Sequence, residues 1–416
     1  MSRRPPDEDD VRTRPNPRGS RPRTKERPRH ADAVPGRVLT VDRGRSTVLV
    51  REGEPEETEV TAVKARELGR AGVVVGDRVH LVGDVSGEPD TLARVVRVDE
   101  RRTVLRRSAD DDDPVERVLV AGADQLAVVV AAADPAPRTG LVDRCLVAAL
   151  DAGMDALLVV TKGDLADPAP LIAAYAALDT PAVVLRRAAG APGEDGGAGQ
   201  DGGAGPQHGG AGPQHDPVGL TALRERLRGR TTVLVGHSGV GKSTLVNALV
   251  PDADRATGRV NDVTGRGRHT SSSALALRLP DPEGGPPQGW VVDTPGVRSF
   301  GLAHVRPSSL LAAFPDLEPG SDGCPRGCTH DEPECGLDAW VASGAAGGAG
   351  PARLASLRRL LRSRSGEESA AGAARDAART RAPGGARSGE PGHDPAHELG
   401  RRPEPGPGSS PVASDR

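Results

Sequence analysis

A glycine-rich segment that ends in a lysine and two hydroxyl residues has the composition of a phosphate-binding loop. It reads Gly-His-Ser-Gly-Val-Gly-Lys-Ser-Thr and fits the Walker A pattern, whose glycines let backbone N–H groups face a β-phosphate. In that pattern Lys242 adds a positive charge beside the β- and γ-phosphates, and the Ser243 hydroxyl binds Mg²⁺. The residues predicted to contact a nucleotide here are Gly236, His237, Ser238, Gly239, Val240, Gly241, Lys242, Ser243 and Thr244.

A second motif supplies an acidic group for the metal. Asp293 ends an apolar run and begins the sequence Asp-Thr-Pro-Gly, about fifty residues after the Walker A loop. We expect Asp293 to contact Mg²⁺ directly or through water, and Gly296 to lie near the γ-phosphate. Asp-x-x-Gly alone is a weak signal, but on a strand at this spacing it becomes specific.

The segment between these motifs is rich in hydroxyl groups. It runs Gly-Arg-His-Thr-Ser-Ser-Ser over residues 267–273, which is typical of a switch I loop whose Ser or Thr closes over Mg²⁺. An ordinary surface loop is the alternative.

A candidate base-recognition motif, Thr161-Lys162-Gly163-Asp164, precedes the Walker A loop. The Asp164 carboxylate can accept the N1–H and N2–H donors of guanine, which adenine lacks, while the Lys162 stem covers the base and ribose. The usual first residue is Asn, so Thr161 replaces only part of its hydrogen bonding, and we expect guanine selectivity with weakened affinity. An unrelated turn at a strand end is the alternative. Because this motif normally follows the Walker A loop, the domain is interpreted as circularly permuted.

The elements that must position these motifs alternate between strands and helices. Apolar runs predict buried strands at 124–131, 156–160, 182–185 and 231–235, with helices near 141–152, 220–227 and 245–250. Ligands of doubly wound sheets bind at the carboxyl ends of the strands, where both motifs fall. The sequence therefore predicts a P-loop α/β domain.

A different pattern precedes this domain. Short alternating runs separated by Gly, Glu and Pro over residues 35–98 predict a small β-barrel; an OB-like barrel and a generic five-stranded module both fit. The run contains no Phe, Trp or Tyr, so any RNA would be held through its phosphates.

A cysteine and histidine cluster follows the α/β domain. Cys324, Cys328, His330 and Cys335 supply three thiolates and one imidazole, a full tetrahedral set for one structural Zn²⁺, with unligated thiols as the alternative. The next leucines predict an amphipathic helix whose arginines either contact rRNA or surround a core-packing face. These arginines are Arg353, Arg358, Arg359 and Arg362.

Composition limits the rest of the chain. It has 416 residues with net charge −3, and its 54 Gly and 38 Pro indicate that much of it is not packed. Residues 1–30 carry ten Lys or Arg against five Asp or Glu, a tail that either contacts RNA phosphates or is simply solvated. The heptapeptide Gly-Gly-Ala-Gly-Pro-Gln-His occurs twice in tandem before residue 216, which predicts a flexible insertion. No apolar run is long enough for a membrane span, so a cytoplasmic location is expected.

In the order of its motifs, with a barrel before them and a metal cluster after them, the chain resembles the circularly permuted RsgA/YjeQ family over residues 35–365. The resemblance implies an OB domain, a permuted GTPase domain and a zinc-containing C-terminal domain. It also implies GTP hydrolysis stimulated by the small ribosomal subunit during late maturation of that subunit.

The resemblance further points to His269 as the catalytic group, because the residue after Asp-x-x-Gly is the apolar Val297. It points to Thr270 or Ser271 as a further Mg²⁺ ligand, with Ser271 slightly favoured, and a structural role for His269 is the alternative. Three departures affect the base site. Thr161 replaces Asn, the family's Ser-Ala segment is not recognisable near Arg187-Ala188, and the tandem insertion follows directly after it.

The sequence as a whole predicts a multidomain protein. Its parts are a disordered basic tail (1–33), an OB-like barrel (34–105), a permuted GTPase domain (114–303) with a flexible insertion (190–215), a small α-rich zinc domain (304–365) and a second disordered tail (366–416). The predicted activity is GTP hydrolysis to GDP and phosphate by a monomer that acts on the small ribosomal subunit and its rRNA. One alternative is an RNA-binding scaffold that binds nucleotide but scarcely hydrolyses it, and another is an ATPase or small-molecule kinase.

Overall fold

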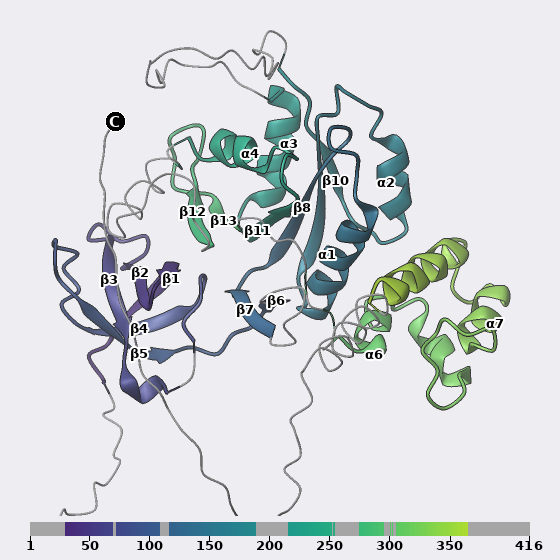
Figure 1. The fold of residues 1–416 in the computed structure, drawn as a ribbon, viewed down its shortest axis with the longest axis horizontal. Helices are drawn as coiled ribbons and strands as arrows, with labels where there is room; N and C mark the ends of the chain where they lie inside the picture. The colour runs from purple at the N-terminus through teal and green to yellow at the C-terminus, as the bar shows by residue number, and fades with distance from the viewer. Residues whose placement is uncertain are drawn as a thin grey trace, which may run out of the picture.

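The computed structural model describes residues 30–69, 72–108, 116–188, 215–251, 253, 274–294, 300, 302 and 305–364. In Figure 1 these residues form a barrel, a central α/β domain and a helical C-terminal part, in that order along the chain. Most of the predicted N-terminal tail, the predicted C-terminal tail and most of the predicted insertion lie outside the described residues.

The N-terminal part is a closed five-stranded barrel. Its strands are β1 (Val34–Asp42), β2 (Arg45–Val50), β3 (Thr58–Lys64), β4 (Arg78–Gly83) and β5 (Ala93–Val98), and η2 (Arg66–Leu68) follows β3. They pair in the order β1-β2-β3-β5-β4, and β4 returns to β1. The β3–β5 pair is parallel and the other pairs are antiparallel. This closed arrangement is OB-like, as the sequence predicted, and valines and leucines from every strand fill its interior.

A hairpin connects the barrel to the central domain. It consists of β6 (Val104–Ser108) and β7 (Glu116–Ala121), which form a separate two-stranded sheet. Leu105 and Val120 are fully buried in the large core that also serves the α/β domain. The hairpin therefore packs on the central domain.

The central domain is a sheet of six strands in the order β10-β9-β8-β11-β13-β12. All neighbours are parallel except the β12–β13 pair. The strands are β8 (Gln125–Ala131), β9 (Asp155–Thr161), β10 (Ala182–Val184), β11 (Thr231–Gly236), β12 (Leu275–Leu279) and β13 (Gly289–Asp293). Strands β8, β9, β10 and β11 were predicted within about two residues at each end.

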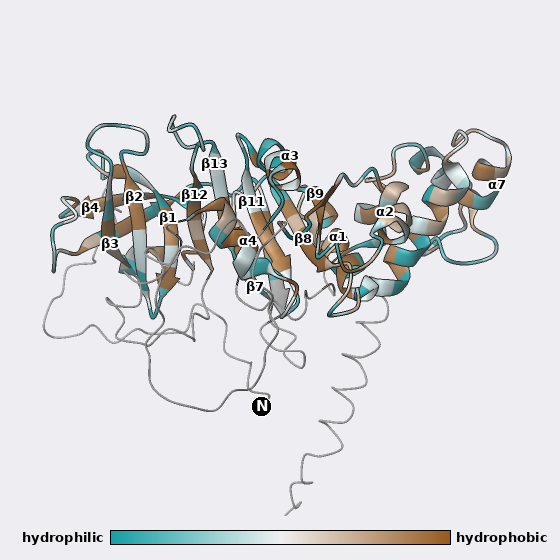
Figure 2. Cartoon of the chain, turned by 90° about the horizontal axis from the view of Figure 1, so that it is seen from above, coloured by the Kyte–Doolittle hydropathy of each residue, from teal (hydrophilic) through white to brown (hydrophobic). Residues whose placement is uncertain are grey.

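Helices cover both faces of this sheet. They are α1 (Thr139–Asp151), α2 (Ala169–Ala176), α3 (Pro217–Leu227) and α4 (Lys242–Leu249). Residues of α3 and α4 pack on one face, and residues of α1 and α2 pack on the other. Figure 2 shows hydrophobic residues (brown) concentrated in the strands, whereas the connecting loops are mostly hydrophilic. Helix α2 begins at two prolines and was not predicted, and neither was β12.

The sheet continues from the central domain into the barrel. Strand β12 pairs with β1 through Thr40 and Leu275, and the Thr40 hydroxyl donates to the Ala274 carbonyl at 3.3 Å. One eleven-stranded sheet thus runs through both parts.

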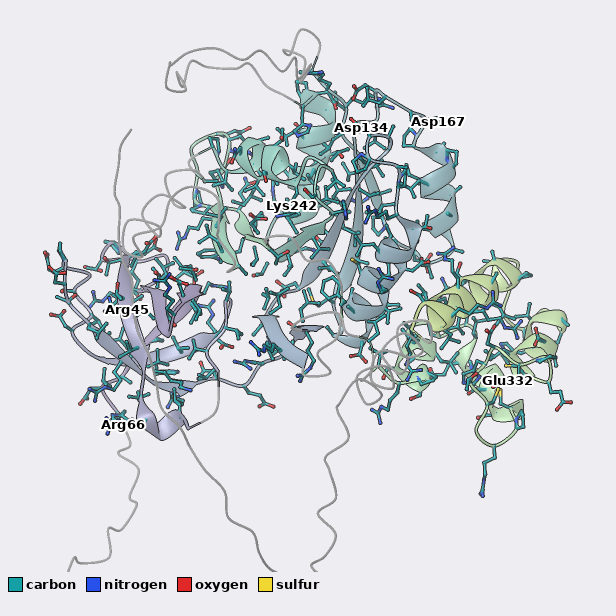
Figure 3. The ribbon with its side chains drawn as sticks, in the orientation of Figure 1. Arg45, Arg66, Asp134, Asp167, Lys242 and Glu332 are labelled. Carbon is teal, nitrogen blue, oxygen red and sulfur yellow. The ribbon has the colours of Figure 1, made fainter. Side chains whose placement is uncertain are left out.

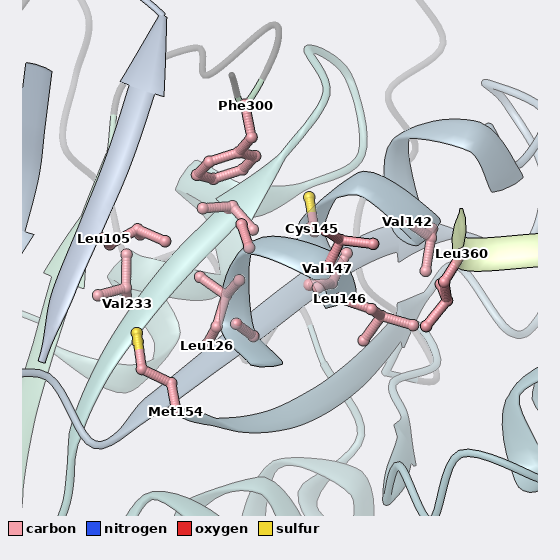
Figure 4. Packing of buried hydrophobic residues seen from close by; sticks show 14 of the residues in the cluster. Leu105, Leu126, Val142, Cys145, Leu146, Val147, Met154, Val233, Phe300 and Leu360 are labelled. Carbon is pink, nitrogen blue, oxygen red and sulfur yellow. The ribbon is translucent and has the colours of Figure 1, made fainter. Parts of the chain in front are cut away.

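The C-terminal part contains α6 (Pro307–Leu311), η3 (Glu318–Gly323), α7 (Gly336–Ala342) and a helix over residues 350–364. Figure 4 shows Leu360 of that last helix beside Val142 and Leu146 of α1. The leucines of the predicted apolar face are all buried there: Leu354, Leu357, Leu360 and Leu361.

The arginines of this helix bind within the protein. Arg353 donates to Asp316 and to Asp179 in the α/β domain, and Arg359 donates to Asp143 of α1. Arg358 donates to Asp338, and Arg362 donates to Asp331. Of the two alternatives for this helix, the structure favours core packing.

Among the described residues, every helix is too short or too polar to cross a bilayer.

Candidate nucleotide and metal sites

The Walker A segment connects the central strand β11 to the first turn of α4. Gly239 and Gly241 adopt φ of +84° and +86°, in the left-handed region that favours glycine. A Cβ on Gly236 would lie 2.7 Å from the Val129 carbonyl oxygen on the neighbouring strand. The glycines therefore permit both the turn and its close approach to β8, and they direct the amino end of α4 at the carboxyl edge of the sheet.

Lys242 and Asp293 meet at this edge. The Lys242 ammonium forms an ion pair with the Asp293 carboxylate, and their side chains are 11% and 30% exposed. The next residue, Thr294, is fully buried and donates its hydroxyl to the Leu234 carbonyl at 2.7 Å. This bond fastens the end of β13 to β11, so the acid stays beside the phosphate loop. Ser243, one residue into α4, is exposed.

Thr161 links the upstream motif to the Walker A loop. It ends β9, is 1% exposed, and donates its hydroxyl to the Val240 carbonyl at 2.6 Å. Lys162 follows with a φ of +53° and donates to the Asp134 carbonyl in the loop after β8. Two motifs about eighty residues apart in sequence are therefore in direct contact. Figure 3 shows Asp134 and Lys242 in the same domain.

The segment after β10 completes this end of the site. The Arg187 backbone N–H donates to the Asp164 carboxylate at 3.0 Å, and the Gly163 N–H donates to the Leu185 carbonyl at 3.0 Å. The sequence has no Ser-Ala segment near Arg187 and Ala188. The structure shows that the backbone at this place reaches Asp164 without a serine side chain. The sequence predicted only that a strand ends just before this segment.

His215, the last residue of the tandem insertion, lies next to this segment. It forms an antiparallel bridge with Arg187, and burial lowers the pKa of its imidazole. Asp216 then caps α3 by accepting the Gly219 N–H at 2.8 Å and also accepts the Arg186 N–H at 2.9 Å. The chain therefore returns from the insertion directly beside the candidate base site.

Four predicted site residues lie outside the described part of the chain. They are His269, Thr270, Ser271 and Gly296.

The cysteine and histidine side chains of the C-terminal part converge on one point. The ligand atoms of Cys324, Cys328, His330 and Cys335 all lie within 4.8 Å of one another. Cys324 Sγ is 3.6 Å from His330 Nδ1 and 3.8 Å from Cys335 Sγ. Ligand bonds of about 2.0–2.3 Å in a tetrahedron place neighbouring ligand atoms about 3.5–3.8 Å apart. These residues therefore fit a tetrahedral metal ion.

The loop around the cluster is held by polar contacts. Hydrogen bonds from Thr329 lower the pKa of the Glu332 carboxyl to about 2, and the Cys328 thiol lies 3.3 Å from the same carboxylate. The His330 carbonyl accepts from Arg358 Nε at 3.1 Å, so the last helix braces the metal ligands. Figure 3 shows Glu332 in this part of the molecule.

Comparisons with known proteins agree with this geometry. The model of the RsgA GTPase family matches residues 98–193 and 213–303. A small ribosomal subunit biogenesis GTPase RsgA from Gemmatimonas aurantiaca is 34% identical over 278 residues, which are 66% of this chain and 80% of that protein. The protein of the same name from Pseudomonas syringae pv. syringae is 36% identical, over 69% of this chain and 75% of the relative.

Two solved structures share the fold. The structure of YjeQ from Thermotoga maritima has a TM-score of 0.53 and 24% identity, and the match covers 80% of this chain and 99% of that one. The structure of YloQ, described as a circularly permuted GTPase, has a TM-score of 0.51 and 20% identity, with 81% and 97% coverage. With the base motif on β9 upstream of the phosphate loop on β11, and with relatives this similar over most of their length, the chain belongs to the RsgA family of circularly permuted GTPases.

Proposed function

We propose that this protein hydrolyses GTP to GDP and phosphate as a biogenesis factor of the small ribosomal subunit. The observation that carries the proposal is the bond from the Thr161 hydroxyl to the Val240 carbonyl, which joins the base motif to the phosphate loop at one edge of the sheet. The names of the relatives, small ribosomal subunit biogenesis GTPase, support the subunit as partner.

In this proposal the Walker A loop, residues 236–244, holds the phosphates. Its backbone N–H groups and the amino end of α4 face the β-phosphate, and Lys242 moves from Asp293 to the β- and γ-phosphates. The Ser243 hydroxyl and the Asp293 carboxylate are then free to hold Mg²⁺, which prefers oxygen ligands. The metal would offset the charge that develops on the phosphates during hydrolysis.

The base is recognised at the other end of the site. Asp164 accepts the N1–H and N2–H of guanine, and the Lys162 stem covers the base. Arg187 N–H donates to Oδ1 of Asp164, so the second oxygen and a further lone pair of Oδ1 remain for the two guanine donors, and the carboxylate is held in direction. Thr161 holds this motif at a constant separation from the phosphate loop.

Hydrolysis also needs a group that orients water, and the apolar Val297 cannot provide it. We assign this role to His269, and a further Mg²⁺ contact to Ser271 or Thr270. A scaffold that binds nucleotide without hydrolysis is less supported, because Lys242 and Asp293 both lie at the carboxyl edge. ATP as the substrate is less supported because adenine offers Asp164 no pair of donors.

Steady-state hydrolysis with purified ribosomal subunits tests the proposal. We expect small subunits to raise the GTP turnover at least tenfold and large subunits to leave it unchanged. Lys242→Ala should abolish turnover, whereas His269→Ala should slow it by at least a hundredfold and leave GTP affinity within about threefold. Turnover that small subunits do not change would remove the subunit from the proposal, and equal turnover in His269→Ala would remove this histidine.

For the cysteine and histidine cluster we propose one structural Zn²⁺. All four tetrahedral positions are filled by Cys324, Cys328, His330 and Cys335, so no position remains for a reacting water. Mass spectrometry of the native protein should find one zinc per chain, and Cys328→Ser should lose it. Cys145→Ala is the matched control, because Cys145 is buried in the core, where burial raises its pKa to about 12. Native protein with intact thiols and far less than one zinc per chain would contradict the assignment.

We also propose the domain limits 34–105, 114–303 and 304–365, flanked by tails at 1–33 and 366–416. We further propose that the protein is a monomer and that it is located in the cytoplasm. Limited proteolysis should cut first in the tails and in the insertion at 190–215.

A further inference from the structure

A cleft of about 620 Å³ lies at the end of the sheet opposite the nucleotide site. Its walls come from the barrel, from the loop after β5 and from the first residues of β11 and β13. Within the part of the chain that the structure describes, seven arginines and five carboxylates line it. The cleft therefore has a positive excess at the junction of the barrel and the central domain.

Four of the five carboxylates are already used by the protein. Glu52 accepts from Arg37, from Arg78 and from the Trp290 indole N–H. Asp77, whose side chain is fully buried, is paired with Arg101. Asp124, the third, accepts the Thr231 backbone N–H at 2.8 Å. Asp99, the fourth, is paired with His80 at 3.0 Å and with Arg97 at 3.6 Å. These four acids hold the walls together, and the exposed Glu100 is the fifth lining carboxylate.

Two arginines in the cleft have free guanidinium groups. Arg102 follows β5 and Arg228 follows α3, so one belongs to the barrel side and the other to the central domain. Both are exposed, and among the described residues neither side chain makes an ion pair or a hydrogen bond. They can therefore bind an anion without breaking an internal contact.

The chemistry of the walls favours a phosphate backbone as the ligand. The Trp290 ring is only 8% exposed, and Arg37 and Arg278 lie over it at 4.9 and 5.2 Å from its centroid. No base can stack there, whereas exposed arginines on two walls suit successive phosphates of a chain. A pocket for a free mononucleotide would need a surface for its base, and the cleft offers none.

We propose that this cleft binds the phosphate backbone of RNA, with Arg102 and Arg228 as its main contacts. The choice of RNA rests on the proposed function in small-subunit biogenesis. Strands β11 and β13 begin at the cleft and end at the Walker A loop and at Asp293, so the two sites are about 13–17 Å apart. RNA and nucleotide therefore bind without competing.

Fluorescence anisotropy with the full chain and a labelled 20-nucleotide oligouridylate tests this, over a series of salt concentrations. Each phosphate contact that is lost on a single strand lowers the slope of log affinity against log salt by about 0.7. Arg102→Glu/Arg228→Glu should thus lower the slope by about 1.4 and weaken binding at least tenfold at low salt. The affinity for GDP should stay within twofold.

The matched control is Arg45→Glu/Arg66→Glu, which makes the same charge change at exposed arginines of the barrel outside the cleft (Figure 3). An equal loss of RNA binding in both double variants would contradict the proposal, because it would show a general effect of net charge. Unchanged binding in Arg102→Glu/Arg228→Glu would also contradict it. The proposal would also be contradicted if Arg102→Glu/Arg228→Glu lost the binding of inorganic triphosphate and kept the binding of RNA, because the cleft would then be a site for a small anion. The two proposals can fail separately. If small subunits do not stimulate GTP hydrolysis, but RNA binding is lost only in Arg102→Glu/Arg228→Glu, the proposed function is overturned and this inference stands.

Discussion

A single hydroxyl group connects the two halves of the proposed nucleotide site. The Asn usual at this place in the motif has two amide donors, whereas Thr161 has one hydroxyl donor, which goes to the Val240 carbonyl at 2.6 Å. Thr161 therefore keeps a contact with the phosphate loop, but it lacks the second amide donor that Asn would supply.

Replacing Thr161 with Val removes this bond and keeps the shape of the side chain. The Val240 carbonyl then lacks its partner in a buried place, a loss of about 1–3 kcal/mol. We expect GDP to bind about tenfold more weakly, as measured by fluorescent GDP titration, because the phosphate loop is less well held. Thr161→Asn should bind at least as tightly as the native protein.

Thr47→Val on the barrel is the matched control. Thr47 is half-buried and, among the described residues, its hydroxyl makes no hydrogen bond. This variant should bind GDP as the native protein does. Native affinity in Thr161→Val would show that the bond does not support the site.

At the scale of residues, the sequence predicted the metal ligands but not the hydrogen-bond partner of Asp164. The spacing of Cys324, Cys328, His330 and Cys335 was enough to predict a convergent metal site, because three thiols and an imidazole within twelve residues form a complete ligand set. The contact of Arg187 with Asp164 was not predictable, because a backbone donor leaves no trace in residue type.

At the scale of elements, the C-terminal helix over residues 350–364 joins the metal-binding part to α1 and α2. Arg359 donates to Asp143 of α1 at 3.1 Å and to the Ala174 carbonyl at 3.0 Å, and it lies 4.7 Å from the centre of the Tyr175 ring. The Asp143 side chain is only 7% exposed. The helix thus places the positive charge of Arg359 beside the buried Asp143 carboxylate of α1.

Arg359→Met keeps the packing of the stem and removes that charge. Burial raises the pKa of Asp143 above its ordinary value, and Arg359 opposes this, so the pKa rises further in the variant. The folded variant then binds a proton that the unfolded chain has released, and its free energy of unfolding falls as pH rises toward the raised pKa. Urea unfolding should show a deficit of about 1–3 kcal/mol at pH 8 that is smaller at pH 5.

Two further variants isolate the pair. Arg226→Met, at an exposed position of α3, should leave the unfolding midpoint unchanged. Arg359→Met/Asp143→Leu should recover part of the lost stability and its pH dependence should disappear. A deficit that does not change with pH would assign the loss to packing instead of to the Asp143 charge.

The elements that sequence predicted are those with a strong periodic signal. Continuous apolar runs made β8, β9 and β11 predictable, because buried parallel strands are apolar on both faces. Strand β12 has only five residues, which give too short a pattern to predict a strand. The choice between rRNA contact and core packing for residues 350–364 depended on tertiary partners, which sequence periodicity does not contain.

The whole molecule is organised around the permuted chain order. The base motif on β9 precedes the Walker A loop on β11, yet the sheet brings both to the same edge. Because of the permuted order, the Asp-Thr-Pro-Gly motif that begins at Asp293 is followed in sequence by the metal-binding part. At the opposite end, strands β11 and β13 begin in the arginine-lined cleft. The order of the motifs in the sequence predicted that the base motif and the Walker A loop meet at one edge of the sheet. The cleft was not predictable, because it forms only where the barrel packs against the central domain.

The turnover of Asp164→Asn with GTP and with xanthosine triphosphate tests the shared site most directly. The substituted amide would no longer offer the carboxylate's acceptors to the guanine N1–H and N2–H, a loss of about 1–3 kcal/mol, and its NH₂ group could donate to the O2 of xanthine. We expect GTP turnover at subsaturating substrate to fall at least tenfold and xanthosine triphosphate turnover to rise by a similar factor, since the base bound at β9 determines which phosphates are cleaved at β11. An unchanged preference for GTP in this variant would show that Asp164 and Lys242 do not hold the same nucleotide.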